Sequence, residues 1–313
     1  MSQPNLLNLK LNLKGSVDPL VGYLKNFSEI DNSILLEVDP TGERLLAKTF
    51  TKDSGSVRFS AISFADCNLS VVSNSGAEAL GNSRILVALL NALKKSISIL
   101  KRFSEINGGN VDMTIDIDYA LVKLKKTGAE HFAGLYIVFS DQKLEMKLDG
   151  FRLSEFKYLT DEKFFSVFNV QTEYSFELSP ETIESIIKTY SIVKLGDSDA
   201  LTFFVEGNGV YVRDSNYKFN SGAIYTEEYE ISLDTQKSVK SSNFTLKIGE
   251  LPTTPTIDLS ANILGSRFVG MVASGEPFRV IFGKPENAPT VDRLLFDSTQ
   301  TNTKLVISTI FRG

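Results

Sequence analysis

A seven-residue phrase that occurs twice constrains the architecture of this chain more than any other feature. Residues 24–30 read LKNFSEI and residues 100–106 read LKRFSEI. Each copy ends a run with apolar residues at helical spacing, and each leads toward a β-rich stretch. Residues 186–214 repeat this layout with different residues. Recurrence of a helix followed by strands predicts that the fold is built more than once from one plan.

Four segments are expected to be helical, two in each half of the chain: 18–30, 83–106, 179–193 and 258–268. The first begins with Asp18 and Pro19, and the third begins with Ser179 and Pro180. A capping side chain followed by proline is a typical helix start. Gly265 interrupts the fourth segment, so its helical signal is the weakest of the four.

Most of the remaining sequence reads as strands. Six runs are short, rich in β-branched and aromatic residues, and partly alternating: 43–50, 56–64, 201–207, 209–214, 278–284 and 304–311. Each half of the chain therefore contains two helices with strands after them. We expect an α+β protein with two similar domains in tandem, at 1–155 and 156–313.

Length and composition narrow the class of protein. A chain of 313 residues suffices for about two domains. No apolar run approaches the ~18 residues of a membrane span, and the start lacks the apolar core of a signal peptide, so neither is expected. Cys67 is the only cysteine, which excludes an internal disulfide and indicates a reducing compartment. The net charge of −5 argues against a basic coat but allows a local basic stripe.

Few residues suggest catalysis or metal binding. Asp112, Asp116 and Asp118 share one face of a predicted strand, where carboxylates can hold Mg²⁺ or Ca²⁺. They lack the spacing of a metal loop, which favours an ordinary solvated strand face. His131 is the only histidine, and no dyad motif surrounds it. We expect no catalytic residue, no metal site and no cofactor.

The predicted helices offer a basic surface instead. Eight basic side chains lie outside or just beyond their apolar stripes: Lys25, Lys94, Lys95, Lys101, Arg102, Lys188, Lys194 and Arg267. Lysine is common on solvated helix faces that have no special role. If the helices lie side by side, the same residues form one surface for a phosphate backbone. Such contacts are electrostatic and carry little sequence specificity.

The chain resembles the DNA polymerase sliding clamps of large tailed bacteriophages. Four stretches carry the resemblance, which is one of layout and scattered residues and is stronger in the second half: YLKNFSEIDNSILLE at 23–37, the run at 179–214 that begins SPETIESIIKTY, EYEISL at 228–233, and the run at 244–284 that begins FTLKIGELP. Residues 107–134 and 285–303 look like additions to a more compact family pattern.

The resemblance implies a fold and a function. Such clamps are PCNA-like rings of three identical subunits, each with two domains of one fold, with sheets outside and two helices per domain lining a hole around duplex DNA. They tether a replicative polymerase and are opened by an ATP-driven clamp loader. For this chain the resemblance implies a homotrimeric processivity factor in the cytoplasm of an infected bacterium. It implies no enzymatic activity, and it makes the eight basic residues above DNA-facing.

The resemblance also implies a place for client proteins. Clamp partners insert a short hydrophobic peptide near the domain connection, which here falls within residues 150–170. The candidate client-binding residues are Phe151, Phe156, Phe164 and Phe165. Simple packing of these aromatic residues is the ordinary alternative. A β-rich virion or structural assembly protein is the alternative function, and an enzyme is the least favoured.

Overall fold

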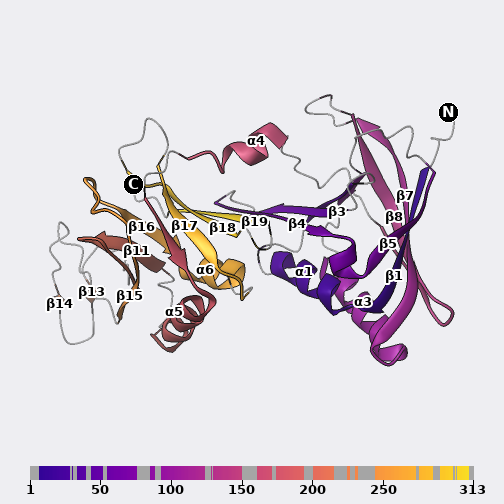
Figure 1. The fold of residues 1–313 in the computed structure, drawn as a ribbon, viewed down its shortest axis with the longest axis horizontal. Coiled ribbons are helices and arrows are strands. Elements are labelled where there is room, and N and C mark those ends of the chain that lie inside the picture. Colours follow the sequence, from indigo (N-terminus) through magenta and orange to yellow (C-terminus); the bar gives the residue numbers. More distant parts are fainter. Residues whose placement is uncertain are drawn as a thin grey trace. The chain divides into compact units, whose positions relative to one another are not determined.

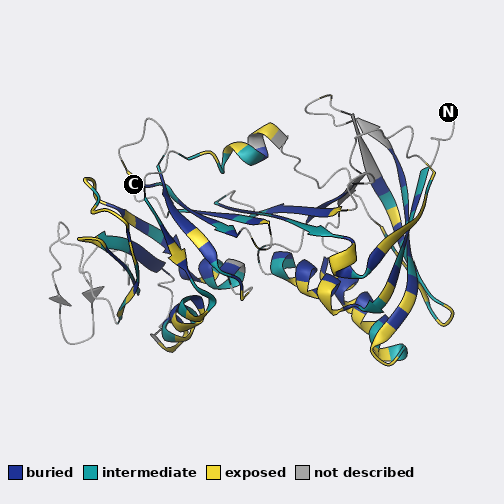
Figure 2. Cartoon of the chain, in the orientation of Figure 1, coloured by how far each residue is buried: buried dark blue, intermediate teal, exposed yellow. Residues whose placement is uncertain are grey.

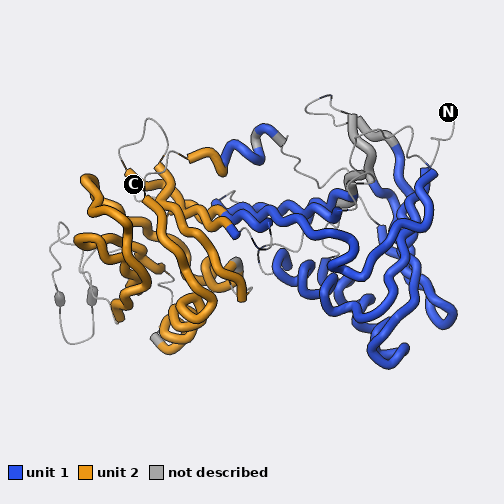
Figure 3. Tube along the Cα trace, viewed as in Figure 1, with its two compact units in different colours: residues 1–167, 298–305 blue, residues 168–297, 306–313 orange. Residues whose placement is uncertain are grey.

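The computed structural model (Figure 1) describes these residues: 7–28, 30, 34–39, 44–51, 55–75, 85–88, 93–123, 128, 130–149, 161–170, 174–193, 200–214, 224–225, 230–231, 244–272, 275–284, 290–298, 300 and 302–309. The chain forms two compact units (Figure 3). Unit 1 comprises residues 1–167 and 298–305, and unit 2 comprises residues 168–297 and 306–313. Among the described residues, no helix is long and apolar enough to cross a membrane.

Unit 1 is built on a sheet. Its strands are β1 (Leu7–Ser16), β2 (Leu35–Asp39), β3 (Arg44–Phe50), β4 (Ser56–Ser63), β5 (Leu69–Asn74), β6 (Ile85–Ala88), β7 (Asn110–Lys123), β8 (Glu130–Ser140) and β9 (Glu145–Asp149). Their order is β4–β3–β2–β6–β8–β7–β1–β5, with β9 beside β8. The β6–β8 pair is parallel, and the other pairs with a described register are antiparallel. Alternation along β1 and β7 gives the sheet one apolar and one polar face.

Two helices cover the apolar face of this sheet (Figure 1), α1 (Asp18–Ser28) and α3 (Leu93–Ile106). The helices contact each other, and the fully buried Phe27 and Phe103 join alternate residues of β1, β7 and β8 in one core. Asp18 and Pro19 occupy the first turn of α1, where the Ser16 hydroxyl accepts a hydrogen bond from the Asp18 amide at 3.1 Å. Two shorter helical segments are η1 (Ala65–Cys67) and α4 (Asp161–Ser166).

The prediction of a helix over 83–106 is wrong at its start. Residues 85–88 form β6, which pairs with β2 and β8, and α3 begins only at Leu93. A short apolar run looks the same in a buried strand and in a helix. Ile85 and Val87 are β-branched and favour the strand.

Unit 2 holds two groups of strands. The first runs β10 (Ser175–Leu178), β17 (Phe278–Gly283), β18 (Arg293–Ser298) and the C-terminal part of β19 (Thr303–Ser308). The second has the order β15 (Thr245–Glu250), β12 (Gly209–Asp214), β11 (Ala200–Glu206) and β16 (Ser260–Leu264). A short pair consists of β13 (Ile224–Tyr225) and β14 (Glu230–Ile231).

Unit 2 also carries two helices, α5 (Pro180–Val193) and α6 (Gly265–Val272), which contact each other. The helix predicted at 179–193 is confirmed as α5. The Ser179 hydroxyl accepts a hydrogen bond from the Thr182 amide at 3.2 Å, and this cap precedes Pro180 as the sequence predicts. Ile183, Ile186 and Tyr190 form the buried stripe of the helix. Each unit thus packs two helices against strands.

The helix predicted at 258–268 is displaced along the chain. Residues 260–264 form β16, and α6 begins at Gly265. A Cβ atom at this glycine would lie 2.5 Å from the Tyr190 ring of α5. The glycine that weakens the helical pattern therefore allows the two helices to approach closely.

Candidate nucleic-acid interface

The exposed face of α3 is the most basic helix surface of unit 1. Its buried positions include Leu93, Ile97, Leu100 and Phe103, which follow the 3.6-residue period and face the core. Six residues on the other side are exposed, as the yellow segments of α3 in Figure 2 indicate: Lys94, Lys95, Ser98, Lys101, Arg102 and Glu105. Four basic side chains therefore share one face with a single acidic side chain.

Local contacts on this face are weak. Arg102 Nη1 lies 3.1 Å from Glu105 Oε2, and both side chains are more than 60% exposed. Solvent screens such a pair, so its attraction is small. The Ser98 hydroxyl donates to the Lys94 carbonyl at 2.8 Å, which keeps the hydroxyl on the helix. The face keeps an excess of positive charge.

Lys25 adds one basic residue from the neighbouring helix. It lies exposed in the last turn of α1, where the negative end of the helix dipole favours a cation. Figure 1 shows α1 and α3 on the same side of the unit 1 sheet. Of the eight basic residues named from the sequence, unit 1 therefore presents five on this pair of helices: Lys25, Lys94, Lys95, Lys101 and Arg102.

The helices of unit 2 are less basic than the sequence suggests. Lys188 is exposed on α5, but its ammonium lies 2.7 Å from the Glu184 carboxylate one turn earlier. Glu181 shares the exposed side, and a hydrogen bond with Ser179 lowers the pKa of its carboxyl. Arg267 on α6 is only partly exposed, and Lys194 lies outside the described residues. The spacing of Glu184 and Lys188 would have signalled their pairing from the sequence.

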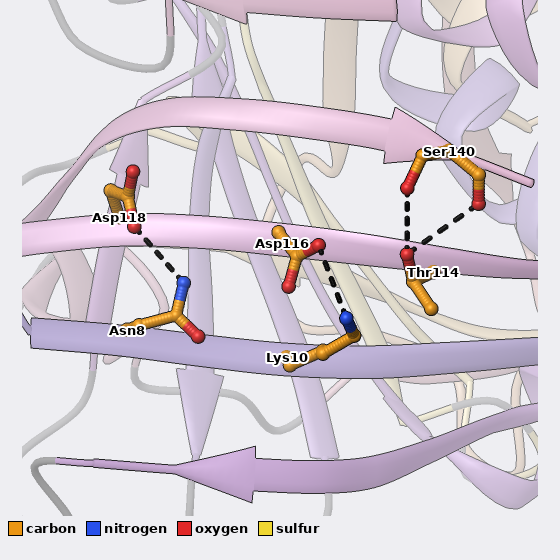
Figure 4. Close-up of polar contacts among 6 residues, drawn as sticks. All are labelled: Asn8, Lys10, Thr114, Asp116, Asp118 and Ser140. Carbon is orange, nitrogen blue, oxygen red and sulfur yellow. Dashed lines mark hydrogen bonds and ion pairs between the residues drawn. The ribbon is translucent and has the colours of Figure 1, made fainter. Parts of the chain in front are cut away.

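The polar residues in one row on β7 have partners on both neighbouring strands (Figure 4). Asn8 Nδ2 donates to Asp118 Oδ1 at 3.0 Å, and Lys10 Nζ lies 3.7 Å from Asp116 Oδ2. Farther along the same face, the hydroxyls of Thr114 and Ser140 lie 2.8 Å apart. Among the described residues, no three acidic, histidine or cysteine side chains come together as metal ligands. The row is a set of cross-strand polar pairs on a partly exposed face.

The candidate client-binding residues divide into two groups. Phe164 is only 2% exposed and packs edge to face against the half-buried Phe165, and both lie on α4. Phe151 and Phe156 lie outside the described residues. The structure therefore gives Phe164 a packing role that the sequence leaves open.

Among the described residues, Cys67 belongs to no group of metal ligands. Cys67 is fully buried in η1, and burial raises the pKa of its thiol to about 12, with the nearby Asp66 charge as a smaller cause. His131 lies in β8, and its side chain is outside the described part of the chain.

Comparison with known proteins identifies the fold. No protein-family model and no curated protein sequence matches the chain. The solved structure of Proliferating Cellular Nuclear Antigen (PCNA) from Entamoeba histolytica is similar, with a TM-score of 0.56 and 12% identity over 97% of this chain and 99% of that one. The A. fulgidus PCNA with the C-terminal region of FEN-1 bound has a TM-score of 0.55 and 8% identity, over 97% of this chain and 99% of that one. The Helicobacter pylori beta clamp bound to a DNA ligase peptide has a TM-score of 0.55 and 12% identity, over 100% of this chain and 67% of that one. The chain has the α+β fold of the sliding clamps.

Proposed function

We propose that this chain is a DNA sliding clamp that encircles duplex DNA and tethers a replicative polymerase for processive phage DNA synthesis. The observation that carries the proposal is the exposed face of α3. On a chain with net charge −5, it presents four basic side chains opposite the apolar stripe that anchors the helix. The clamp fold suggests a role for this face, because a clamp requires helices that attract DNA phosphates without recognising the base sequence.

The attraction to DNA is diffuse in this proposal. Lys94, Lys95, Lys101 and Arg102 stand in solvent, where mobile ions screen each charge within a Debye length of ~8 Å at physiological salt. Tight ion pairs with phosphates would hinder sliding. Lys25, Lys188, Lys194 and Arg267 complete the proposed DNA-facing set. Lys188 shares its exposed helix face with two acidic residues, Glu181 and Glu184, so this face lacks the positive excess of α3.

We propose that three copies close a ring through free strand edges. In the described residues β9 pairs only with β8 in unit 1, and β15 pairs only with β12 in unit 2. Each edge leaves backbone groups available for another strand. Pairing of β9 from one copy with β15 from the next is a heterologous contact, which repeats around a ring if the rotation closes. In this proposal each copy contributes two clamp domains, at 1–155 and 156–313.

The remaining partners are proposed by analogy. The A. fulgidus and H. pylori structures contain a bound FEN-1 region and a DNA ligase peptide. We infer that this chain also takes peptide segments of clients, the polymerase among them, and that a clamp loader opens the ring. The clamp catalyses nothing, needs no cofactor, and works in the cytoplasm of the infected bacterium.

Retention on end-blocked DNA tests the proposal. The protein is added to a linear duplex fixed to a bead at one end, and the free end is then blocked. The complex is washed at about 1 M salt, where the Debye length falls to about 3 Å and electrostatic binding is lost. We expect the protein to stay on blocked DNA and to leave when the duplex is cut. Equal loss from blocked and unblocked DNA would contradict encirclement.

A further inference from the structure

The turn that leads into β9 is tied to the end of α3. Residues 141–144 form this turn between β8 and β9. Asn107, the residue after α3, donates a hydrogen bond from Nδ2 to Asp141 Oδ2 at 2.6 Å. Lys143 reaches back to the helix, and its ammonium donates to Asn107 Oδ1 at 2.9 Å and to the Ile106 carbonyl at 3.3 Å. Asn107, Asp141 and Lys143 are called the turn latch below.

The two central residues of the turn latch are also fixed within their own elements. Asn107 Nδ2 donates to the Phe103 carbonyl at 2.9 Å, which holds the amide on the last turn of the helix. Asp141 Oδ1 accepts from the backbone amides of Lys143 at 2.7 Å and Leu144 at 2.8 Å. Partial burial disfavours the charge of Asp141, but these hydrogen bonds and the one from Asn107 hold the pKa of its carboxyl below its ordinary value. At neutral pH the latch is therefore charge-assisted.

The latch also completes the end of α3. The chain leaves the helix through Gly108 and Gly109, whose φ angles of 70° and 100° favour glycine. The last carbonyls of a helix lack partners within it, and the negative end of the helix dipole favours a cation. The Lys143 ammonium meets both needs from the turn before β9. The last turn of α3 and the start of β9 are thus held to each other.

The position of β9 has few other determinants in unit 1. The strand has five residues, and in the described part of the chain it pairs only with β8. Leu144, Met146 and Leu148 are only partly buried where they pack against the core. A shift of one residue in the pairing of a strand turns every side chain to the opposite face. An edge that must pair with another copy therefore needs a fixed start.

We propose that Asn107 and Lys143 are positioning residues for ring closure, which hold β9 where the next copy can pair with it by fastening its turn to the helix that carries the DNA-facing charges. This inference rests on the proposed function, because it assigns two residues a role in closing the ring. It also connects the two parts of unit 1 that the function uses, the α3 face and the β9 edge. Loss of the latch should leave the unit folded and weaken the ring.

An exchange of donor and acceptor across the latch provides the test. Asn107→Asp places two carboxylates against each other, and adding Asp141→Asn restores a hydrogen bond with the donor on the other side. Native mass spectrometry over a dilution series of the full chain measures the concentration of half assembly. We expect this concentration to rise about tenfold in Asn107→Asp, as for one lost charge-assisted hydrogen bond, and to return toward the wild-type value in the double variant. Asn110→Asp, the same change at a nearby exposed residue, should assemble like the wild type.

Hydrogen exchange distinguishes positioning from a general loss of stability. The measurement uses the full chain at a concentration too low for assembly. Amides of residues 141–149 should exchange faster in Asn107→Asp than in the wild type, while amides of β1 and β7 should exchange at the same rate in both. Faster exchange throughout unit 1 would show that Asn107 acts through overall folding and would overturn the proposal.

The proposal is also overturned if Asn107→Asp assembles as well as the wild type, if the double variant stays as weak as the single one, or if exchange in residues 141–149 is unchanged. Each of these results leaves the ring standing, because the wild type still assembles. A wild type that forms no three-copy species at any concentration would instead remove the ring, and the role of the latch in closing it.

Discussion

The buried ion pair between Lys48 on β3 and Glu37 on β2, whose charged atoms lie 2.8 Å apart, allows a test at the scale of single residues. Lys48→Met leaves the Glu37 carboxylate buried without its ammonium, and breaking such a pair from one side costs about 3 to 5 kcal/mol of stability. Lys48→Met with Glu37→Gln removes both charges and should recover most of the loss. Urea unfolding of the two variants checks this. Equal stability of both variants would show that the pair contributes little.

Cys67 gives a second test, in which pH is the variable. Burial raises the pKa of its thiol from 9.0 to about 12, so the stabilisation from the neutral thiol is present below about pH 9 and is lost as the pH rises toward 12. The thiolate is the reactive form. At pH 8 we expect a disulfide reagent to label the native chain slowly and the urea-unfolded chain rapidly. Rapid, complete labelling of native protein would contradict the burial of this residue.

The helix α3 carries the functional claim at the scale of elements. We expect the variant Lys94→Ala/Lys95→Ala/Lys101→Ala/Arg102→Ala to assemble normally and to bind DNA more weakly. All four side chains are exposed and lie outside the apolar stripe, and exposed changes usually alter stability by about 0.5 kcal/mol or less. In a titration of linear duplex, the log–log dependence of affinity on salt should flatten by up to about 0.9 for each phosphate that the variant no longer neutralises.

A charge-matched control distinguishes the effect of the α3 face on DNA binding from the effect of net charge. The control carries alanine at four basic residues outside the helices: Lys10, Lys14, Arg44 and Arg279. Both variants change the net charge from −5 to −9, since each loses four positive charges. The control should bind duplex DNA much more strongly than the α3 variant. Equal weakening in both would show that overall charge, not this helix, attracts DNA.

The elements also show what the sequence can and cannot predict. Strand runs such as 209–214 and the capped helix at 179–193 are found in the structure, because β-branched residues, turn residues and a cap followed by proline act locally. The error at 83–106 arises because residues 85–88 acquire their conformation from pairing with β2 and β8. The residues of a short segment do not indicate which distant strands the segment will pair with.

The candidate site also has a part that local sequence predicts and a part that depends on contacts between distant residues. The basic face of α3 could be predicted because its residues lie on one helix at helical spacing. The burial of Lys48 could not, because its ion-pair partner is Glu37 and one ring that covers it belongs to Phe164, more than a hundred positions away in the sequence. No spacing rule connects a strand in one part of the chain with a short helix in another.

At the scale of the whole molecule, the free edges of β9 and β15 predict assembly. Native mass spectrometry of the purified chain should show a species of about 104 kDa, which is three chains of 34.6 kDa. A three-copy species is expected because each head-to-tail interface pairs one β9 edge with one β15 edge, and closure of the ring leaves none of these edges uncovered. A stable monomer of 34.6 kDa at micromolar concentration would weigh heavily against this arrangement.

The central claim is that the chain surrounds DNA with its helices inward. Electron microscopy of the purified full-length chain measures this most directly. We predict a closed ring of three copies, with α1, α3, α5 and α6 lining a hole wide enough for duplex DNA and the sheets outside. A ring with α3 on its outer rim, or particles that never close, would contradict the account.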